Sequence, residues 1–199
     1  MAGVRQDLRR ALDTLAFRQA GYFTAAQALE VGYSYQAQKH HVDAGNWVRV
    51  DRGIFRLPHW PAEAEDSYVR WALWSKGRGV LSHESALSVH GLSDVDPRQI
   101  HLTVGRDFHA SDEAIVLHFV DLGDEDIESR GAWSLTTPSR TIVDVADGET
   151  PQEHVTAALG EALDRGLVTR RRMREESERR SDRAALRVER ALSSRESSR

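Results

Sequence analysis

The sequence predicts an α+β protein built in two parts, and three observations predict it. Residues 23–57 combine two short capped helices with a β-hairpin pattern. Residues 99–104 alternate apolar and polar side chains, and residues 115–120 form a denser apolar run, so both are strand candidates. Residues 170–199 alternate arginine and glutamate and contain few apolar residues. We therefore expect a small helical domain with a hairpin, then a mixed α/β domain with a small sheet and a helical C-terminal tail.

Capping residues set the boundaries of the two short N-terminal helices. The hydroxyls of Thr24 and Ser34 can each accept a hydrogen bond from the free N–H groups of a first helical turn. Gly32 and Gly45 can adopt the left-handed conformation that ends a helix. Helix, turn, helix and hairpin in this order form a winged helix-turn-helix, whose second helix enters the major groove while the hairpin forms the wing. The two helices are expected at residues 25–31 and 35–44.

The second of these helices and the hairpin carry the candidate DNA contacts. Glutamine and lysine offer suitable donors and acceptors for base edges, and serine, tyrosine and lysine reach phosphates. The wing arginines are expected to have no carboxylate neighbour except Asp51. The packed side of the helix is expected to hold Ala37, His41, Val42 and Ala44. The predicted DNA-binding residues are Thr24, Ser34, Tyr35, Gln36, Lys39, His40, Arg49, Arg52 and Arg56.

A different interpretation of the same residues stays open. The charges can be ordinary solvated groups on a small helical domain that binds protein, with the helix-turn-helix serving as a scaffold. The distribution of charge favours DNA binding. Residues 1–60 carry 8 basic and 5 acidic residues, residues 61–150 carry 7 and 17, and residues 151–199 carry 12 and 9, which gives +3, −10 and +3 and the net charge of −4. Such asymmetry suggests different partners for the different parts.

The remaining sequence predicts a second domain after Pro61, which gives domains at residues 1–60 and 61–199. Residues 63–76 fit an amphipathic helix rich in aromatic residues, which are expected to be core. Further helices are expected at residues 82–90, at 139–146 after Pro138, and at 152–165. A third short strand is expected at 133–135. The charged tail is expected to form one or two solvated helices.

Composition narrows the class of protein. The chain contains no run of 18 apolar residues, so no membrane helix is expected. Its first ten residues lack the apolar segment of a signal peptide. It contains no cysteine, which excludes disulfides and thiolate metal sites. A cytoplasmic protein is the simple expectation.

The sequence gives no catalytic, metal or cofactor site. Nine histidines are present, but neither H-E-x-x-H nor a P-loop pattern occurs. His83 and His90 share a helix face but lie two turns apart, too far for one metal ion, while His101 and His118 fall on strands and could be neighbours. A restriction-type nuclease is the enzyme alternative. It would need a lysine beside two carboxylates, and the chain has only Lys39 and Lys76. We expect the protein not to be an enzyme.

Several sequence blocks together resemble the AbiEi family of antitoxins. The wing segment at residues 45–57 (GNWVRVDRGIFRL) resembles the N-terminal domain of that family. The order and spacing of the later blocks are similar to its C-terminal domain, and the resemblance covers roughly residues 5–165. These blocks are residues 81–87 (LSHESAL), 90–92 (HGL), 100–104 (IHLTV) and 135–144 (LTTPSRTIVD).

The resemblance implies the antitoxin of a type IV toxin–antitoxin system. Such a protein represses its own operon by binding inverted repeats upstream of it. Its C-terminal domain counteracts a cognate nucleotidyltransferase-like toxin, AbiEii, without a stable complex in the founding members. Since the sequence contains no sustained heptad pattern, we expect a monomer that pairs on DNA. The alternatives are a winged-helix regulator without a toxin partner and a DNA-binding domain fused to a nuclease-like domain.

Overall fold

The computed structural model describes residues 2–61, 63 and 65–196, and its chain divides into two compact units. The N-terminal unit comprises Met1–Arg78 with Gly131–Trp133, and the C-terminal unit comprises Gly79–Arg130 with Ser134–Arg199. Helices accompany a three-stranded sheet in the first unit and a five-stranded sheet in the second, so the predicted α+β class is confirmed. The contacts group residues 61–78 with the first unit, whereas the sequence-based boundary lies at Pro61.

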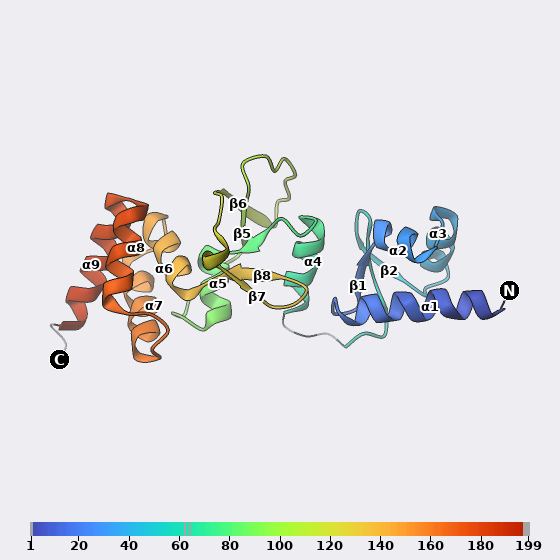
Figure 1. Ribbon diagram of the computed structural model, residues 1–199, viewed down its shortest axis with the longest axis horizontal. Helices are drawn as coiled ribbons and strands as arrows, with labels where there is room; N and C mark the ends of the chain where they lie inside the picture. The colour runs from blue at the N-terminus through green and yellow to red at the C-terminus, as the bar shows by residue number, and fades with distance from the viewer. Residues whose placement is uncertain (1, 62, 64, 197–199) are drawn as a thin grey trace. The chain divides into compact units, whose positions relative to one another are not determined.

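The N-terminal unit has the helix and strand order of a winged helix-turn-helix (Figure 1). Its sheet is antiparallel with the order β1-β3-β2. The sequence does not predict the strand β1, because it is only three residues long and its last residue, Thr24, is also the N-cap of α2. The elements are α1 (Ala2–Phe17), β1 (Tyr22–Thr24), α2 (Ala25–Val31), α3 (Tyr35–Asp43), β2 (Val48–Asp51), β3 (Ile54–Arg56) and α4 (Asp66–Trp74).

The predicted caps are present at both short helices. The Thr24 hydroxyl accepts a hydrogen bond from the Gln27 backbone N–H at 3.1 Å, and the Gln27 side chain accepts one from the Thr24 N–H at 2.8 Å, which completes a capping box. Gly32 ends α2 with a φ of 115°, which an L side chain rarely adopts. Ser34 caps α3 by accepting from the Ala37 N–H at 3.2 Å. These local rules fix where α3 begins.

The structure buries one residue of α3 that the sequence assigned to neither side of the helix, and it corrects the expectation for Ala44. Gln38 is only 3% exposed, and its amide donates to the carbonyl oxygens of Tyr33 at 3.0 Å and Ala25 at 3.1 Å. Gln38 can be buried because its amide is hydrogen-bonded to a carbonyl of the turn before α3 and to the carbonyl of the first residue of α2. Ala44, expected on the packed side, is exposed because α3 ends at Asp43 and Ala44 follows as its C-cap.

The C-terminal unit is a mixed sheet with the strand order β6-β5-β4-β8-β7, accompanied by five helices within the described residues (Figure 1). Parallel pairs join β5 to β6 and β4 to β8, and the other two pairs are antiparallel. The sequence does not predict β4 and β7, which are only two and three residues long. The elements are β4 (Val80–Leu81), α5 (His83–His90), β5 (Ile100–Val104), β6 (Ile115–Phe119), β7 (Ile127–Ser129), β8 (Ser134–Thr136), α6 (Pro138–Asp147), α7 (Gln152–Asp164), α8 (Arg170–Arg180) and α9 (Asp182–Glu196), with a 3-10 turn at Asp124–Asp126.

The tail helices α8 and α9 are part of the main core, so the prediction of solvated helices is wrong. Met173 on α8 and Val188 and Leu192 on α9 are fully buried in a cluster with residues of α6 and α7. The few apolar residues of the tail recur at helical spacing, so they gather on one face while arginine and glutamate cover the other. A thin apolar stripe is therefore sufficient to attach each helix.

Arg187 on α9 also ties the tail to the end of α6. Its guanidinium donates to the backbone carbonyls of Gly148 at 2.9 Å and Ala146 at 3.3 Å, and to that of Thr150. The last carbonyls of a helix lack partners within the helix, and a guanidinium with five donors can satisfy several of them.

Of the helices in the described part of the chain, each is too short or too polar to cross a lipid bilayer.

The packed tail generates a prediction about α9. Leu192→Ala should lower the free energy of unfolding by about 2–5 kcal/mol, because it leaves a cavity in the core. Leu186→Ala on the same helix is the matched control, since Leu186 is 54% exposed and its truncation should change stability by less than about 0.5 kcal/mol. Urea denaturation followed by circular dichroism measures both. Equal effects of the two substitutions would contradict the packed arrangement.

Candidate nucleic-acid interface

The outer face of α3 presents the side chains predicted to reach DNA bases. Tyr35, Gln36, Lys39 and His40 are all exposed, and the Tyr35 side chain remains 69% accessible. Lys39 pairs with Asp43 one turn later, with 2.6 Å between Nζ and Oδ2, but both side chains are more than half exposed. An exposed pair of this kind is weak and can exchange for a phosphate or a base edge. The predicted exposure is therefore confirmed, while contact with DNA stays a prediction.

A buried set of aromatic rings holds the inner face of α3. Trp47 lies at its centre, with ring centroids 4.7 Å from His41, 5.1 Å from Tyr33 and 4.9 Å from Phe23. The His41 ring stacks on the indole, and burial is the main cause that lowers the pKa of His41 below its usual value. Packing of this kind is specific in geometry as well as favourable in area. It positions α3 on the sheet that also carries the wing.

The wing places two arginines in solvent. Arg49 on β2 and Arg52 in the turn are exposed, and neither forms an ion pair with a carboxylate of the described residues. Asp51 does not neutralise Arg52. From Arg52 the Asp51 carboxylate accepts the backbone N–H, at 2.6 Å, and not the guanidinium. Its other oxygen pairs with the guanidinium of Arg70 on α4 at 2.9 Å. The hydrogen bond from Arg70 is the main cause that lowers the pKa of Asp51. Both wing guanidiniums therefore stay available.

Arg56 behaves differently from the other two arginines, and the expectation that it has no carboxylate neighbour is wrong. Its guanidinium donates to the Asp66 carboxylate and, at 3.0 Å, to the Pro61 carbonyl, and it lies 5.1 Å from the centroid of the Tyr22 ring. Its side chain is only 19% exposed. The sequence could not show this pair because Asp66 belongs to the following helix. We leave Arg56 out of the proposed DNA contacts.

Thr24 and Ser34 serve first as helix caps. In each cap the hydroxyl oxygen accepts a backbone N–H, so its own proton stays free to donate. Ser34 is exposed beside α3, whereas Thr24 is half-buried. Ser34 is therefore better placed for a phosphate contact.

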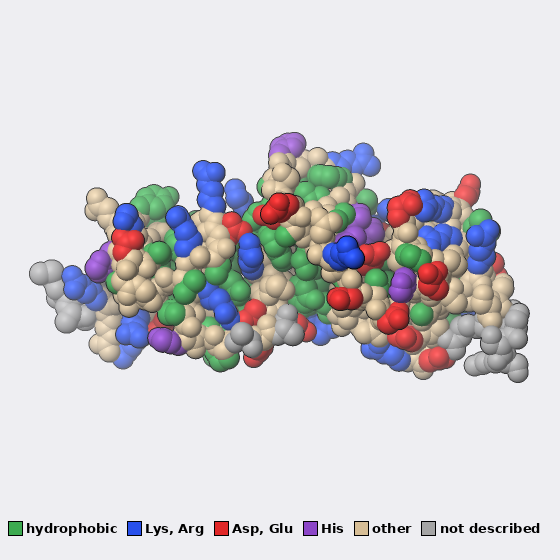
Figure 2. Space-filling view, turned by 180° about the vertical axis from the view of Figure 1, so that it is seen from behind, with side chains coloured by type: hydrophobic (Ala, Val, Ile, Leu, Met, Phe, Trp, Pro, Cys, Tyr) green, Lys and Arg blue, Asp and Glu red, His purple; other side chains and the backbone are tan. Residues whose placement is uncertain are grey.

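The distribution of surface charge differs between the N-terminal unit and the tail helices. Figure 2 shows Lys and Arg side chains spread over the N-terminal unit with few acidic side chains among them on this face. Over α8 and α9 the basic and acidic side chains alternate instead (Figure 2). Intrahelical pairs such as Arg171–Glu175 at 2.7 Å and Arg172–Glu176 at 2.6 Å account for the alternation. Several basic residues of the tail are thus paired with carboxylates, unlike Arg49 and Arg52 of the wing.

The C-terminal unit brings three histidines together, and the expected proximity of His101 and His118 is confirmed. The Nδ1 atom of His101 lies 3.1 Å from Nε2 of His118, and the His83 ring stacks on His118 with 3.4 Å between centroids. His90 lies elsewhere, with Nε2 2.8 Å from the Thr136 carbonyl. Among the described residues, no group of three or more histidine, aspartate or glutamate side chains has the geometry to hold a metal ion.

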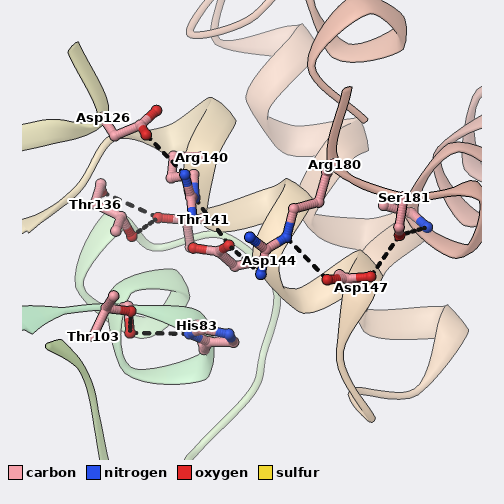
Figure 3. A network of polar contacts seen from close by, with 12 residues as sticks. His83, Thr103, Asp126, Thr136, Arg140, Thr141, Asp144, Asp147, Arg180 and Ser181 are labelled. Atoms are coloured by element: carbon pink, nitrogen blue, oxygen red, sulfur yellow. Dashed lines mark hydrogen bonds and ion pairs between the residues drawn. The ribbon is translucent and has the colours of Figure 1, made fainter. Parts of the chain in front are cut away.

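Beside these histidines, an ion-pair network connects α6 to its neighbours (Figure 3). Arg140 donates to Asp126 at 2.7 Å and to Asp144 at 2.9 Å, and Arg180 of α8 donates to Asp147 at 2.9 Å. Burial, the largest effect on Asp144, raises the pKa of its carboxyl although Arg140 opposes the shift. The Arg140–Asp144 pair lies within α6, whereas the Arg140–Asp126 and Arg180–Asp147 pairs tie α6 to the chain around it.

The comparisons with known proteins bear on the N-terminal unit most directly. Residues 10–58 match the model of a protein family described as "Transcriptional regulator, AbiEi antitoxin". The match confirms the predicted resemblance to the AbiEi antitoxin family, and it contains α2, α3 and the wing. A comparison with curated protein sequences finds no match.

One solved structure has a similar fold over most of the chain. It is the crystal structure of the RV2827C protein from Mycobacterium tuberculosis, with a TM-score of 0.61 and 17% sequence identity. The similarity covers 94% of this chain and 76% of that one. At this identity the likeness shows a shared fold.

The histidine cluster predicts that stability falls in mild acid. Burial, with smaller contributions from neighbouring charges, lowers the pKa of His83 to about 2 and that of His118 to about 4, and burial also lowers that of His101. The unfolded chain therefore takes up protons first as pH falls below about 6.5, and the folded state loses stability from there down to about pH 4 through His118 and down to about pH 2 through His83.

The measurement is urea denaturation between pH 7.5 and pH 5. His118 should contribute a loss of about 2 kcal/mol over this interval. His118→Gln should flatten the pH dependence, and His109→Gln, at an exposed loop position, should leave it unchanged. A slope that is the same in wild type and His118→Gln would exclude this cause.

Proposed function

We propose that this protein is an autoregulating antitoxin of a type IV toxin–antitoxin system. In this proposal α3 and the wing bind inverted repeats upstream of its own operon, and the C-terminal unit counteracts a nucleotidyltransferase-like toxin. One observation carries the DNA-binding part: the residues matched by the antitoxin regulator family are those that expose Gln36 and Lys39 on an anchored helix. The exposed Arg49 and Arg52 support it, since unpaired guanidiniums are the usual partners of phosphates.

The roles of individual residues follow from their positions. Gln36 and Lys39 read base edges in the major groove, with Tyr35 and His40 beside them. Arg49 and Arg52 contact the sugar-phosphate backbone through the wing. The protein is a monomer off DNA, and two copies meet on an inverted repeat whose half-sites lie about one turn, or a multiple of a turn, apart. Pairing on DNA gives weak protein contacts a high effective concentration.

A winged-helix regulator without a toxin partner is the second candidate. It is favoured by one observation, that the family match ends at residue 58 and leaves the C-terminal unit outside. A nuclease-like C-terminal unit has less support. Both lysines of the chain, Lys39 and Lys76, belong to the N-terminal unit, so the C-terminal unit has none to place beside paired carboxylates.

The wing proposal predicts a particular salt dependence. Arg49→Ala or Arg52→Ala should weaken binding to all DNA sequences alike and reduce the slope of log affinity against log salt by about one unit. Fluorescence anisotropy over a salt series measures this. Arg98→Ala, an exposed arginine of the C-terminal unit, is the control and should leave the slope unchanged. Wild-type slopes for both wing variants would place the DNA elsewhere.

The two activities should be separable in the full chain. A triple variant, Gln36→Ala, Lys39→Ala and Arg52→Ala, changes only exposed residues and should lose repression while its fold and stability are retained. Expressed from an independent promoter, it should still rescue cells that produce the nucleotidyltransferase-like toxin of the proposed system. Loss of rescue in a folded triple variant would mean that neutralisation depends on DNA binding. Failure of the wild-type protein to rescue would favour the regulator without a toxin.

A further inference from the structure

A cavity of about 860 Å³ in the N-terminal unit lies against the helix proposed to read DNA. Its lining comes from α1, from α3 and the turns before and after it, and from the segment just after the wing. The volume falls in the range of small-molecule sites, about 300–1,000 Å³. None of the proposed DNA contacts requires such a cavity.

The walls of the cavity are aromatic and apolar. Trp47 and Tyr33 are each less than a tenth exposed and form part of the wall together with Leu12. Trp60 lies on the side of the segment after the wing. His41 already stacks on Trp47, and Tyr33 packs edge-on against it, so a ligand ring can contact only the ring edges that these residues leave open. Edge-to-face contact of this kind is a favourable arrangement for a second ring.

The polar groups of the cavity favour an anion. Arg5 and Arg9 on α1 and the imidazoles of His40 and His59 contribute to the lining, whereas Asp13 is its one acidic residue. The Arg9–Asp13 pair is long, at 3.7 Å, and its arginine side chain is 81% exposed, so the pair is weak and Arg9 can turn to a ligand. A guanidinium binds a carboxylate through two parallel hydrogen bonds.

Tyr33 adds a donor inside the cavity. Burial raises the pKa of Tyr33, and the nearby Asp13 carboxylate raises it further, so the phenol keeps its proton. Its hydroxyl forms no hydrogen bond with another of the described residues. A bound carboxylate could accept this proton together with those of the arginines.

We propose that this cavity binds a small planar aromatic carboxylate, with the ring against Trp47 and Tyr33 and the carboxylate on Arg5 and Arg9. Resting on the proposed function, we add one consequence. Ser34 and His40 belong both to the lining and to the expected DNA side of α3, so a bound anion lies near the DNA phosphates. Its negative charge repels them, and binding of the ligand therefore weakens binding of DNA.

The first experiment measures binding alone. Isothermal titration of the full chain with naphthalene-2-carboxylate should show one saturable site, with a dissociation constant on the order of 0.1–1 mM for a ligand of this size. The neutral probe naphthalene-2-carboxamide should bind at least about tenfold more weakly. The double variant Arg5→Gln, Arg9→Gln should lose carboxylate binding, and Arg10→Gln, exposed on the same helix but outside the lining, should retain it. Equal affinity for acid and amide, or no saturable binding, would overturn the proposal.

The second experiment measures the consequence for DNA. Saturating naphthalene-2-carboxylate should weaken operator binding by the wild-type chain at least about threefold and leave the double variant unaffected. Unchanged DNA affinity with the ligand bound would overturn the coupling. If the wild-type chain bound no DNA, the proposed function would be contradicted. The calorimetric titration would still show whether the cavity binds the carboxylate, so failure of the function and failure of the cavity proposal can be distinguished.

Discussion

The packing around Trp47 is the constraint on which the N-terminal unit depends. The indole contacts Phe23 on β1, Phe55 on β3, and both Tyr33 and His41 beside or within α3. The sheet, the wing strand and the proposed recognition helix are thus fixed to one buried ring system. Gln38 strengthens the same junction, because its amide donates to the carbonyl of Ala25 at the start of α2 and to that of Tyr33 in the turn between α2 and α3. A rigid inner face allows the outer face of α3 to carry polar residues whose spacing is set by the helix alone.

The sequence predicted those features that depend on residues close together along the chain. Thr24 and Ser34 were recognisable as caps because a cap is a rule about residues three positions apart. The pairs that sequence could not show join residues of different elements. Arg56 finds Asp66 on the next helix, and Asp51 finds Arg70 there rather than Arg52 in its own turn. Of three wing arginines that look equivalent in sequence, the fold thereby engages one and leaves two in solvent.

For the tail, the prediction from composition was wrong. Its composition is typical of a solvated helix, yet Met173, Val188 and Leu192 lie in the main core. The low overall hydrophobicity of the tail did not indicate burial, because a helix packs on a core when only the residues on one of its faces are apolar. Arg187 could not be assigned from sequence either, since its partners are backbone carbonyls at the end of α6. The C-terminal unit is thus held by an apolar core, by ion pairs around Arg140, and by a charged residue used as a helix cap.

Competition binding tests whether α3 reads DNA bases as proposed. The full chain should bind the duplex upstream of its own gene and prefer it to duplexes with single base changes in the inverted repeat. Gln36→Ala and Lys39→Ala should each cost about 1–3 kcal/mol and relax the preference at one base position of each half-site. Tight binding by both variants with an unchanged preference profile would contradict the account, because the base contacts would then come from another part of the protein.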